Sequence, residues 1–396
     1  MKKKGKITRR DFIYTGSVAA ISAPIMANAR IGVSNPIKES SSKIVEQEWR
    51  NRQPGMAYRQ LGRTGMMISE IVNGGGPVKL DNLRPTEKAV EMGLNYLDTA
   101  PAYSDGESET AIGKLLSTSI KRDKVFLTTK VSEFPDFRNN LYKEIFDGLP
   151  SSKQEALLKK AAEMRKERGV DKPGYFVPYW PGQTHQMDPV YLCNAMMEEY
   201  GEQVEGNPAF EKMIFESLEG SLKRVGTDHF DILMCPHGCN APEEVNNPFI
   251  VSAFEKLKKQ GKVRFLGFTA HHDMANILKA ASDSGNFDVA MIGYNMINFG
   301  FTEYVIKEAA ENGMGIIAMK VARIVSSTIE EFNPLPEWRS AMLDQVVPGD
   351  MKLPVKAYLW ALQNPNLSAV ISDLDTEEIV AENLAIAGKK VDLREA

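Results

Sequence analysis

Residues 95–109 read Asn-Tyr-Leu-Asp-Thr-Ala-Pro-Ala-Tyr-Ser-Asp-Gly-Glu-Ser-Glu, which places Asp98 and Tyr103 just after a short apolar run. A carboxylate beside a phenol is a combination that moves protons. Tyrosine has a pKa of about 10, so its phenol acts as a general acid near neutrality only if neighbours perturb it, and a lysine ammonium nearby favours the phenolate. The stretch therefore predicts a catalytic site that also contains a lysine.

Two further apolar runs of β type end in polar residues. Residues 126–130, Phe-Leu-Thr-Thr-Lys, end at Lys130, and residues 230–237, Phe-Asp-Ile-Leu-Met-Cys-Pro-His, end at His237. In a parallel α/β barrel the carboxyl ends of the strands converge on one face, where active sites lie. Three strand ends that each deliver a polar residue therefore indicate one active site.

From Met56 onward strand and helix signals alternate, which implies a parallel sheet with crossover helices. Eight runs have the character of strands, and we expect them to end near Gly74, Asp98, Lys130, His237, Thr269, Tyr294, Lys320 and Ser372. Apolar residues recur at three-and-four spacing between them, which predicts helices over 86–92, 209–224, 248–260, 274–283, 302–312 and 354–363. Eight such units close an α/β barrel.

Four of these residues resemble a known catalytic tetrad. Asp98, Tyr103, Lys130 and His237 are similar, in order and placement, to the Asp, Tyr, Lys and His of the aldo/keto reductases. The sequence pattern of residues 98–109, Asp-Thr-Ala-x-x-Tyr-x-x-x-x-Ser-Glu, is fairly specific for that family. Residues 58–65 resemble its N-terminal hairpin, residues 225–231 its lead into the fourth strand, and residues 382–384 its last cofactor-loop helix.

The resemblance covers roughly residues 56–388. It implies a (β/α)8 TIM barrel with an N-terminal hairpin and a large insertion after strand 3. It also implies an oxidoreductase that moves a hydride between a nicotinamide cofactor and an aldehyde or ketone. In that family Tyr103 would be the general acid, Lys130 and Asp98 would tune it, and His237 would orient the carbonyl.

Two alternatives to catalysis stay open. Asp98 and Lys130 can form a buried ion pair that serves only the barrel, and His237 can be a core histidine with satisfied hydrogen bonds. At the level of the whole protein, the alternative is a small-molecule binding protein that keeps a relic tetrad without dinucleotide turnover. The tetrad's family order favours the enzyme.

The same resemblance implies a site for NAD or NADP. Its expected contacts are Gly74, Thr269, Tyr294, Lys320, Arg323, Ser372, Thr376, Glu382 and Asn383. Arg323 would meet the pyrophosphate. The chain departs from the family where Met291 replaces a glutamine that commonly holds the carboxamide.

The last cofactor loop departs further. Residues 370–379 read Val-Ile-Ser-Asp-Leu-Asp-Thr-Glu-Glu-Ile, with Ser372 and Asp373 in the usual Pro-Gly places and Ile379 where an arginine for the 2′-phosphate tends to be. Carboxylates repel a phosphate but accept hydrogen bonds from a ribose 2′-hydroxyl. The loop therefore favours NAD slightly, and weakened dinucleotide binding is the alternative.

Residues 133–207 fit no barrel unit and form the insertion. Within it, residues 151–168 predict an exposed helix rich in lysine and glutamate. The following segment, residues 173–181, combines four aromatic residues with three prolines. Since it follows Lys130, it should emerge on the catalytic face, where loops tune binding. It is either an active-site lid or a small satellite core.

Three cysteines leave several possibilities. Cys235 and Cys239 flank His237, and Cys193 lies in the insertion. A disulfide between Cys235 and Cys239, or metal ligation with His237 and residues 271–272, competes with ordinary small thiols. The spacing matches no zinc pattern, and we predict no metal.

The first residues predict export. Six Lys or Arg residues precede a modest apolar run over 12–26, and residues 27–29, Ala-Asn-Ala, suit signal peptidase. Thr8-Arg-Arg-Asp-Phe-Ile13 resembles a twin-arginine signal, so residues 1–29 would bring the protein to the export machinery and then to the periplasm. Residues 30–55 are predicted to be a linker, and residues 389–396 a C-terminal tail.

Charge and hydropathy exclude some partners. The formal net charge is −4, and loss of the signal, which carries a net +5, would leave about −9. Such a balance argues against nucleic acid, whose partners present basic surfaces. The apolar run near the start is shorter than the ~20 residues of a membrane span, and we expect no stable span elsewhere.

Replacing Arg9 and Arg10 together by lysine should leave precursor in the cytosol, because the export machinery reads the arginine pair. Cell fractionation with antibody detection measures this, and the unmodified chain should yield a mature protein that begins near Arg30. Unchanged export of the double-lysine variant would reject the twin-arginine route.

Overall fold

The computed structural model describes residues 45–394. The predicted export signal, the first part of the predicted linker (residues 30–44) and the last two residues of the predicted tail lie outside the described residues.

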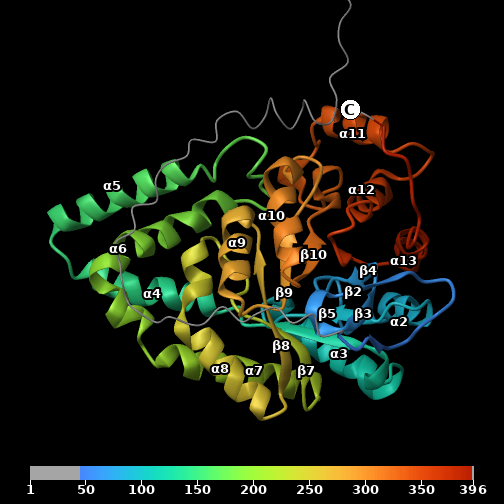
Figure 1. Ribbon diagram of the computed structural model, residues 1–396, viewed down its shortest axis with the longest axis horizontal. Coiled ribbons are helices and arrows are strands. Elements are labelled where there is room, and N and C mark those ends of the chain that lie inside the picture. Colours follow the sequence, from blue (N-terminus) through green and yellow to red (C-terminus); the bar gives the residue numbers. More distant parts are fainter. Residues whose placement is uncertain (1–44, 395–396) are drawn as a thin grey trace, which may run out of the picture.

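Eight parallel strands close into a barrel, as Figure 1 shows, which confirms the predicted fold. Around the barrel the strands follow the order β10-β11-β4-β5-β6-β7-β8-β9. They are β4 (Ile71–Asn73), β5 (Tyr96–Asp98), β6 (Phe126–Lys130), β7 (Phe230–Met234), β8 (Val263–Ala270), β9 (Val289–Gly293), β10 (Gly315–Met319) and β11 (Ala369–Ser372). All eight end at or within three residues of the ends expected from the sequence.

Helices surround the barrel and cross from each strand to the next. They are α2 (Arg84–Glu91), α3 (Glu107–Thr118), α7 (Ala209–Val225), α8 (Pro248–Lys259), α9 (Met274–Ser284), α10 (Phe299–Glu311), α11 (Glu337–Val346), α12 (Leu353–Leu362) and α13 (Glu377–Leu384). Short 3-10 helices are η1 (Gly62–Thr64), η2 (Tyr103–Gly106), η3 (Arg122–Lys124), η4 (Gln183–Gln186), η5 (Pro242–Asn246), η6 (Ala322–Ile324) and η7 (Glu330–Phe332). The helices bury their apolar faces against the outside of the strands.

A small sheet closes the amino end of the barrel. The predicted hairpin is β2 (Tyr58–Gln60) paired antiparallel with β3 (Met66–Ser69), and Met66 and Ile68 belong to the same buried cluster as the barrel interior. A Cβ at Gly62 would lie 2.2 Å from the backbone nitrogen of Gly315. Glycine is therefore required where the hairpin touches the start of β10.

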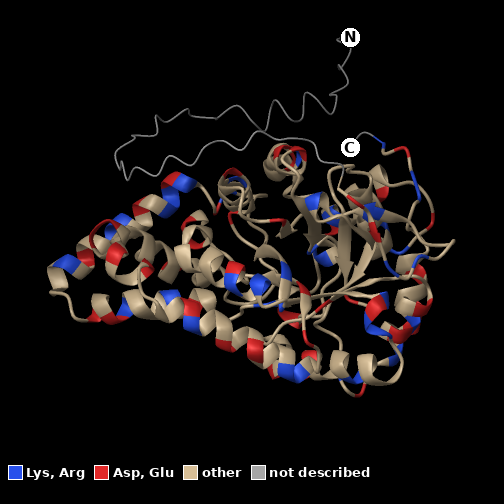
Figure 2. Ribbon diagram, turned by 60° about the horizontal axis from the view of Figure 1, so that its bottom comes forward, with Lys and Arg blue, Asp and Glu red and all other residues tan. Residues whose placement is uncertain are grey.

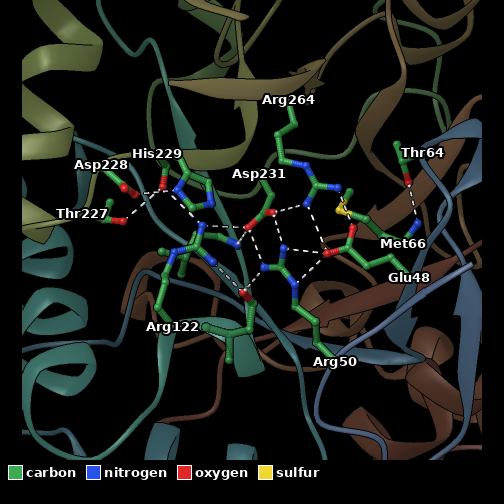
Figure 3. Close-up of polar contacts among 12 residues, drawn as sticks. Glu48, Arg50, Thr64, Met66, Arg122, Thr227, Asp228, His229, Asp231 and Arg264 are labelled. Atoms are coloured by element: carbon green, nitrogen blue, oxygen red, sulfur yellow. Dashed lines mark hydrogen bonds and ion pairs between the residues drawn. The ribbon is translucent and has the colours of Figure 1, made fainter. Parts of the chain in front are cut away.

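The predicted linker, residues 30–55, is wrong for the part that the structure describes. Strand β1 (Glu48–Trp49) pairs parallel with β3, and Arg50 reaches the buried carboxylate of Asp231. Figure 3 shows Asp231 at the centre of three guanidinium groups, from Arg50, Arg122 and Arg264, at contacts of 3.0, 2.9 and 2.6 Å. This end of the segment is therefore part of the folded barrel.

The electrostatics of Asp231 follow from this cluster. Burial disfavours its charged form, but the guanidinium groups of Arg122 and Arg50 outweigh burial and lower the pKa of Asp231. The carboxylate stays ionised and links the start of β7 to a segment that precedes it by 181 positions.

The insertion forms a helical arm. It contains α4 (Phe134–Asp147), α5 (Ser151–Arg168) and α6 (Met187–Glu205), which extend to one side of the barrel in Figure 1. Only Leu157 and Ala161 of α5 are buried, and both signs of charge line this exposed helix in Figure 2. The prediction of an exposed helix over 151–168 is confirmed.

Buried polar groups fix the arm to the barrel. Arg138 in α4 donates from Nε to Glu205 Oε1 at 2.7 Å, and Glu205 Oε2 accepts from Asn247 Nδ2 at the same distance. Arg168 forms a two-pronged contact with Glu243, at 2.7 and 2.9 Å. Because these charged contacts join α4, α5 and α6 to the loop after β7, the arm is held in one position beside the strand ends.

The last described residues lie against the barrel helices. The backbone N–H of Val391 donates to Gln363 Oε1, and that of Arg394 donates to the carbonyl of Val346. Among residues 45–394, none of the helices combines the length and the apolar composition needed to cross a membrane.

Asp231→Ala should destabilise the fold by about 3 kcal/mol, because it removes the buried carboxylate that three partly buried guanidinium groups share. Urea unfolding followed by circular dichroism measures the change. Glu311→Ala removes a carboxylate that pairs with Lys307 at an exposed site, so this control should cost about 1 kcal/mol or less. Equal losses in the two variants would contradict a structural role for the cluster.

Candidate active site

The four residues of the predicted tetrad converge at the carboxyl end of the barrel. Asp98 and Lys130 are the last residues of β5 and β6, Tyr103 begins η2, and His237 follows β7. Asp98, Tyr103 and His237 border one cavity, whereas the Lys130 side chain is buried behind them.

Asp98 and Lys130 form a buried ion pair. Both side chains are 1% exposed, and Lys130 Nζ lies 2.6 and 2.5 Å from the two carboxylate oxygens of Asp98. The same ammonium donates to the carbonyl of Thr99 at 2.8 Å. Burial raises the pKa of Asp98 and lowers that of Lys130, while their mutual attraction opposes both shifts. Three hydrogen bonds therefore fix the ammonium below the cavity wall.

Tyr103 stands beside this pair on a strained turn. Ser104 and Asp105, which follow it, have φ of 50° and 52°, in the left-handed region that non-glycine residues rarely adopt. The Lys130 ammonium lies 4.6 Å from the centre of the Tyr103 ring. Burial, followed by the charge of Asp98, raises the pKa of Tyr103 well above its usual value. The phenol is thus protonated at neutral pH and can donate a proton.

The raised pKa of Tyr103 differs from the prediction made from the sequence, in which a nearby lysine was expected to favour the phenolate. Lys130 directs its protons to Asp98 and Thr99. The carboxylate of Asp98 and the carbonyl of Thr99 therefore partly neutralise the charge of the ammonium. The negative charge of Asp98 then has the larger effect on the pKa of the phenol.

His237 faces Tyr103 across the cavity. The two ring centres are 5.9 Å apart with the planes nearly perpendicular. Burial, and then the positive charges of Lys130 and Lys320, lower the pKa of His237 well below its usual value. The imidazole is neutral at pH 7, and in the tautomer whose Nδ1 accepts from Ser132 the other ring nitrogen has an N–H that can donate to a ligand oxygen.

Ser132 holds the His237 ring, a role that the sequence reasoning missed. Its hydroxyl lies 2.8 Å from His237 Nδ1. Ser132 follows Lys130 by two positions, so its place beyond the same strand end was a signal available in the sequence. The contact sets the orientation of the ring and the nitrogen that points into the cavity.

The cavity has a volume of about 1100 Å³ and runs from the tetrad to α13. Glycines 74–76 form one wall, and a Cβ on Gly75 would lie 2.3 Å from the carbonyl oxygen of Asp98. Glycine therefore lets the end of β4 approach the end of β5 and leaves bare backbone beside the tetrad. Such a wall leaves room for a flat ring.

Five of the expected cofactor residues border this cavity. They are Gly74, Lys320, Arg323, Glu382 and Asn383. Three others lie behind the wall: Ser372 accepts from Asn383 Nδ2 at 2.9 Å, Thr376 caps α13 through the N–H of Ile379, and Thr269 accepts from the N–H of Gly238 at 2.7 Å. These three support the wall and do not face the cavity.

Tyr294 is wrong as a predicted cofactor contact. Its ring stacks on Trp360 with centres 5.2 Å apart, on the outer side of the barrel. Successive side chains of a strand point to opposite faces. Met291 faces the barrel interior and borders the cavity, so a residue three positions later faces outward.

The aromatic segment of the insertion both packs and reaches the cavity. Tyr175 and Tyr179 are buried, and the Tyr179 hydroxyl accepts from Asn295 Nδ2 at 2.9 Å. Trp180 borders the cavity, with its ring edge-on to His271 at 5.0 Å. The two sequence interpretations, lid and satellite core, are thus not exclusive.

The end of the cavity near α13 is acidic. Asp373, Asp375 and Glu382 border it. Arg323 lies 3.6 Å from Asp373, and Lys352 lies 2.6 Å from Glu382 and 3.0 Å from Glu378. A dinucleotide fits this arrangement: Arg323 offers a cation for a pyrophosphate, and the carboxylates offer acceptors for ribose hydroxyls.

The three cysteines are free and buried in the structure. Within residues 45–394 no group of His, Cys, Asp and Glu side chains is arranged to hold a metal ion.

The sequence profile of the aldo/keto reductase family matches residues 72–206 and 203–394. The chain belongs to the aldo/keto reductase family. Among curated relatives, the aldo-keto reductase AMT2 of Alternaria alternata is 26% identical over 279 residues, which are 66% of this chain and 63% of that protein. The NADH-specific methylglyoxal reductase of Escherichia coli is 21% identical, over 82% of this chain and 91% of that protein.

A solved structure agrees on the fold of this aldo/keto reductase. The holo form of aldo-keto reductase AKR11C1 from Bacillus halodurans superposes with a TM-score of 0.55 at 21% identity, over 85% of this chain and 92% of that one. At this identity the likeness supports the barrel alone. The evidence for the chemistry of this aldo/keto reductase therefore comes from its own residues.

Proposed function

We propose that this protein is a NAD(P)-dependent carbonyl reductase in which Tyr103 is the general acid. The observation that carries the proposal is the Tyr103 phenol on the cavity wall, with its ring centre 5.9 Å from that of His237 and 4.6 Å from the Lys130 ammonium. Family membership supports oxidoreductase chemistry.

In the proposed reaction, His237, Tyr103 and Lys130 each have a separate role. When bound, a reduced nicotinamide supplies a hydride to the carbonyl carbon of the substrate. His237 donates a hydrogen bond that orients the carbonyl oxygen, and Tyr103 Oη delivers a proton to that oxygen as negative charge develops on it. The Lys130 ammonium, 4.6 Å from the ring centre, then attracts the phenolate and opposes its repulsion by Asp98 until it takes a proton from solvent.

Several residues would hold the cofactor. Arg323 would approach the pyrophosphate, the glycine wall at 74–76 would lie against the nicotinamide, and Asn383 would face the adenosine part. We propose that NAD is preferred, because the carboxylates of Asp373 and Glu382 would repel a 2′-phosphate.

One observation favours the second candidate, a binding protein with a relic tetrad. Met291 presents a thioether to the cavity where the family commonly has a glutamine for the carboxamide. Loss of that hydrogen bond weakens cofactor positioning. The complete and buried Asp98–Lys130 pair weighs more, and we propose the enzyme, acting after export to the periplasm.

Tyr103→Phe removes one hydroxyl and should reduce kcat for carbonyl reduction by roughly 10²–10⁴-fold, as expected for a lost general acid. Steady-state oxidation of NADH with a panel of aldehydes measures the effect, and calorimetry should show nearly unchanged NADH affinity. Tyr304→Phe, at a residue that is 62% exposed, is the matched control. Undiminished activity in Tyr103→Phe would require another proton donor.

Ile379→Arg should raise affinity for NADP(H) selectively, because an arginine fork pairs with a phosphate and gains little from a free hydroxyl. Titration calorimetry with both dinucleotides measures it, and the parent should bind NAD(H) at least as tightly as NADP(H). Ile379→Gln is the control for size without charge. Strong NADP(H) preference in the parent would show that the acidic loop does not face the 2′ position.

A further inference from the structure

Lys320 follows β10 with a backbone conformation that its residue type disfavours. Its φ is 61°, in the left-handed region that a residue other than glycine rarely adopts. Alternation along β10 points Ile317 and Met319 inward, so a regular continuation would turn Lys320 outward. The left-handed conformation interrupts the alternation, and Lys320 borders the cavity.

Among residues 45–394, no carboxylate forms an ion pair with the Lys320 ammonium, although the charge of Asp373 acts on it from farther away. No carboxylate of residues 45–394 lies within 4.0 Å of it, and its closest aromatic neighbours are Trp180 and Tyr179, at 5.5 and 6.0 Å from the ring centres. Burial, and then the charge of Arg323, lower the pKa of Lys320 to about 8. The group is still mostly cationic at pH 7, yet it is poorly solvated and would be stabilised by an anion.

The other cations around the cavity are already paired. Lys130 is held by Asp98, Lys352 by Glu382, and Arg323 lies beside Asp373. The charge of Lys320 instead acts on the tetrad side, where it lowers the pKa of both His237 and His271. The cavity thus has an acidic end near α13 and one unpaired cation near the catalytic histidine.

We propose that Lys320 binds a carboxylate of the substrate, so that the favoured substrates are aldehydes or ketones that carry a carboxylate group. The inference rests on the proposed function and names its substrate class. The Lys320 ammonium is a single point charge and pairs with the single charge of a carboxylate. Trp180 beside the ammonium covers the apolar middle of such a substrate, and the neutral His271 adds a hydrogen-bonding group at the same wall.

Two aldehydes of equal shape test the proposal by kinetics. 4-Carboxybenzaldehyde and methyl 4-formylbenzoate differ in the charge of one group. We expect the parent to prefer the acid in kcat/KM by about tenfold or more, the scale of a charge-assisted hydrogen bond. Lys320→Met should abolish this preference and Lys320→Arg should retain it. Lys352→Met, which removes a paired cation from the same cavity, should leave the ratio of acid to ester within about twofold.

Binding without turnover keeps the proposal separate from the reductase assignment. Calorimetry with 4-(hydroxymethyl)benzoate and its methyl ester, in the presence of NAD, should show the same tenfold preference and the same loss in Lys320→Met. Acid preference that depends on Lys320, in a protein that reduces no carbonyl compound, would support the anion site and overturn only the proposed reaction.

Equal affinity of the parent for acid and ester would overturn the proposal. So would a Lys320→Met variant that loses dinucleotide affinity while its ratio of acid to ester affinity is unchanged, because Lys320 would then serve the pyrophosphate. If Lys320→Met does not fold, the comparison of acid with ester in the parent and in Lys320→Arg still decides.

Discussion

The active site depends on one buried ion pair, between Asp98 at the end of β5 and Lys130 at the end of β6. Neither charge has access to water, so each is stable only with the other. The pair links two adjacent strand ends, and a third bond to the carbonyl of Thr99 connects it to the turn that carries Tyr103. The pair therefore fixes an ammonium 4.6 Å from the centre of the Tyr103 ring, beside the phenol that would donate the proton.

The rest of the cavity separates charge along its length. The carboxylates of the loop after β11 lie at the end of the cavity near α13, where Arg323 contacts Asp373, whereas the charge of Lys320 acts on His237 of the tetrad. This order suits a long ligand with a sugar at one end, and a shorter anionic ligand beside the phenol. The helical arm completes the catalytic end through Trp180, and its buried contacts from Arg138 and Arg168 hold it in place.

The barrel and the tetrad were predictable because their signals are local: each strand is an apolar run, and each tetrad residue lies at or just beyond the end of one. The direction in which a side chain points was harder to predict from the sequence. Tyr294 was misplaced although alternation from Met291 indicates its outward direction, and the inward direction of Lys320 depends on a left-handed backbone that no sequence pattern announces. The role of Arg50 could not be predicted, because its partner Asp231 is 181 positions away and a polar segment before a barrel reads as a linker.

The proposed reaction transfers a hydride directly from a nicotinamide to a carbonyl carbon in the cavity beside Tyr103. The most direct measurement uses NADH deuterated at C4, separately on each face, with a panel of aldehydes and mass spectrometry of the alcohols formed. The account predicts that one of the two labelled cofactors delivers one deuterium to the carbinol carbon, and that the other delivers none. Alcohol formed without deuterium from either cofactor, or no alcohol from any aldehyde while NAD(H) is bound, would contradict it.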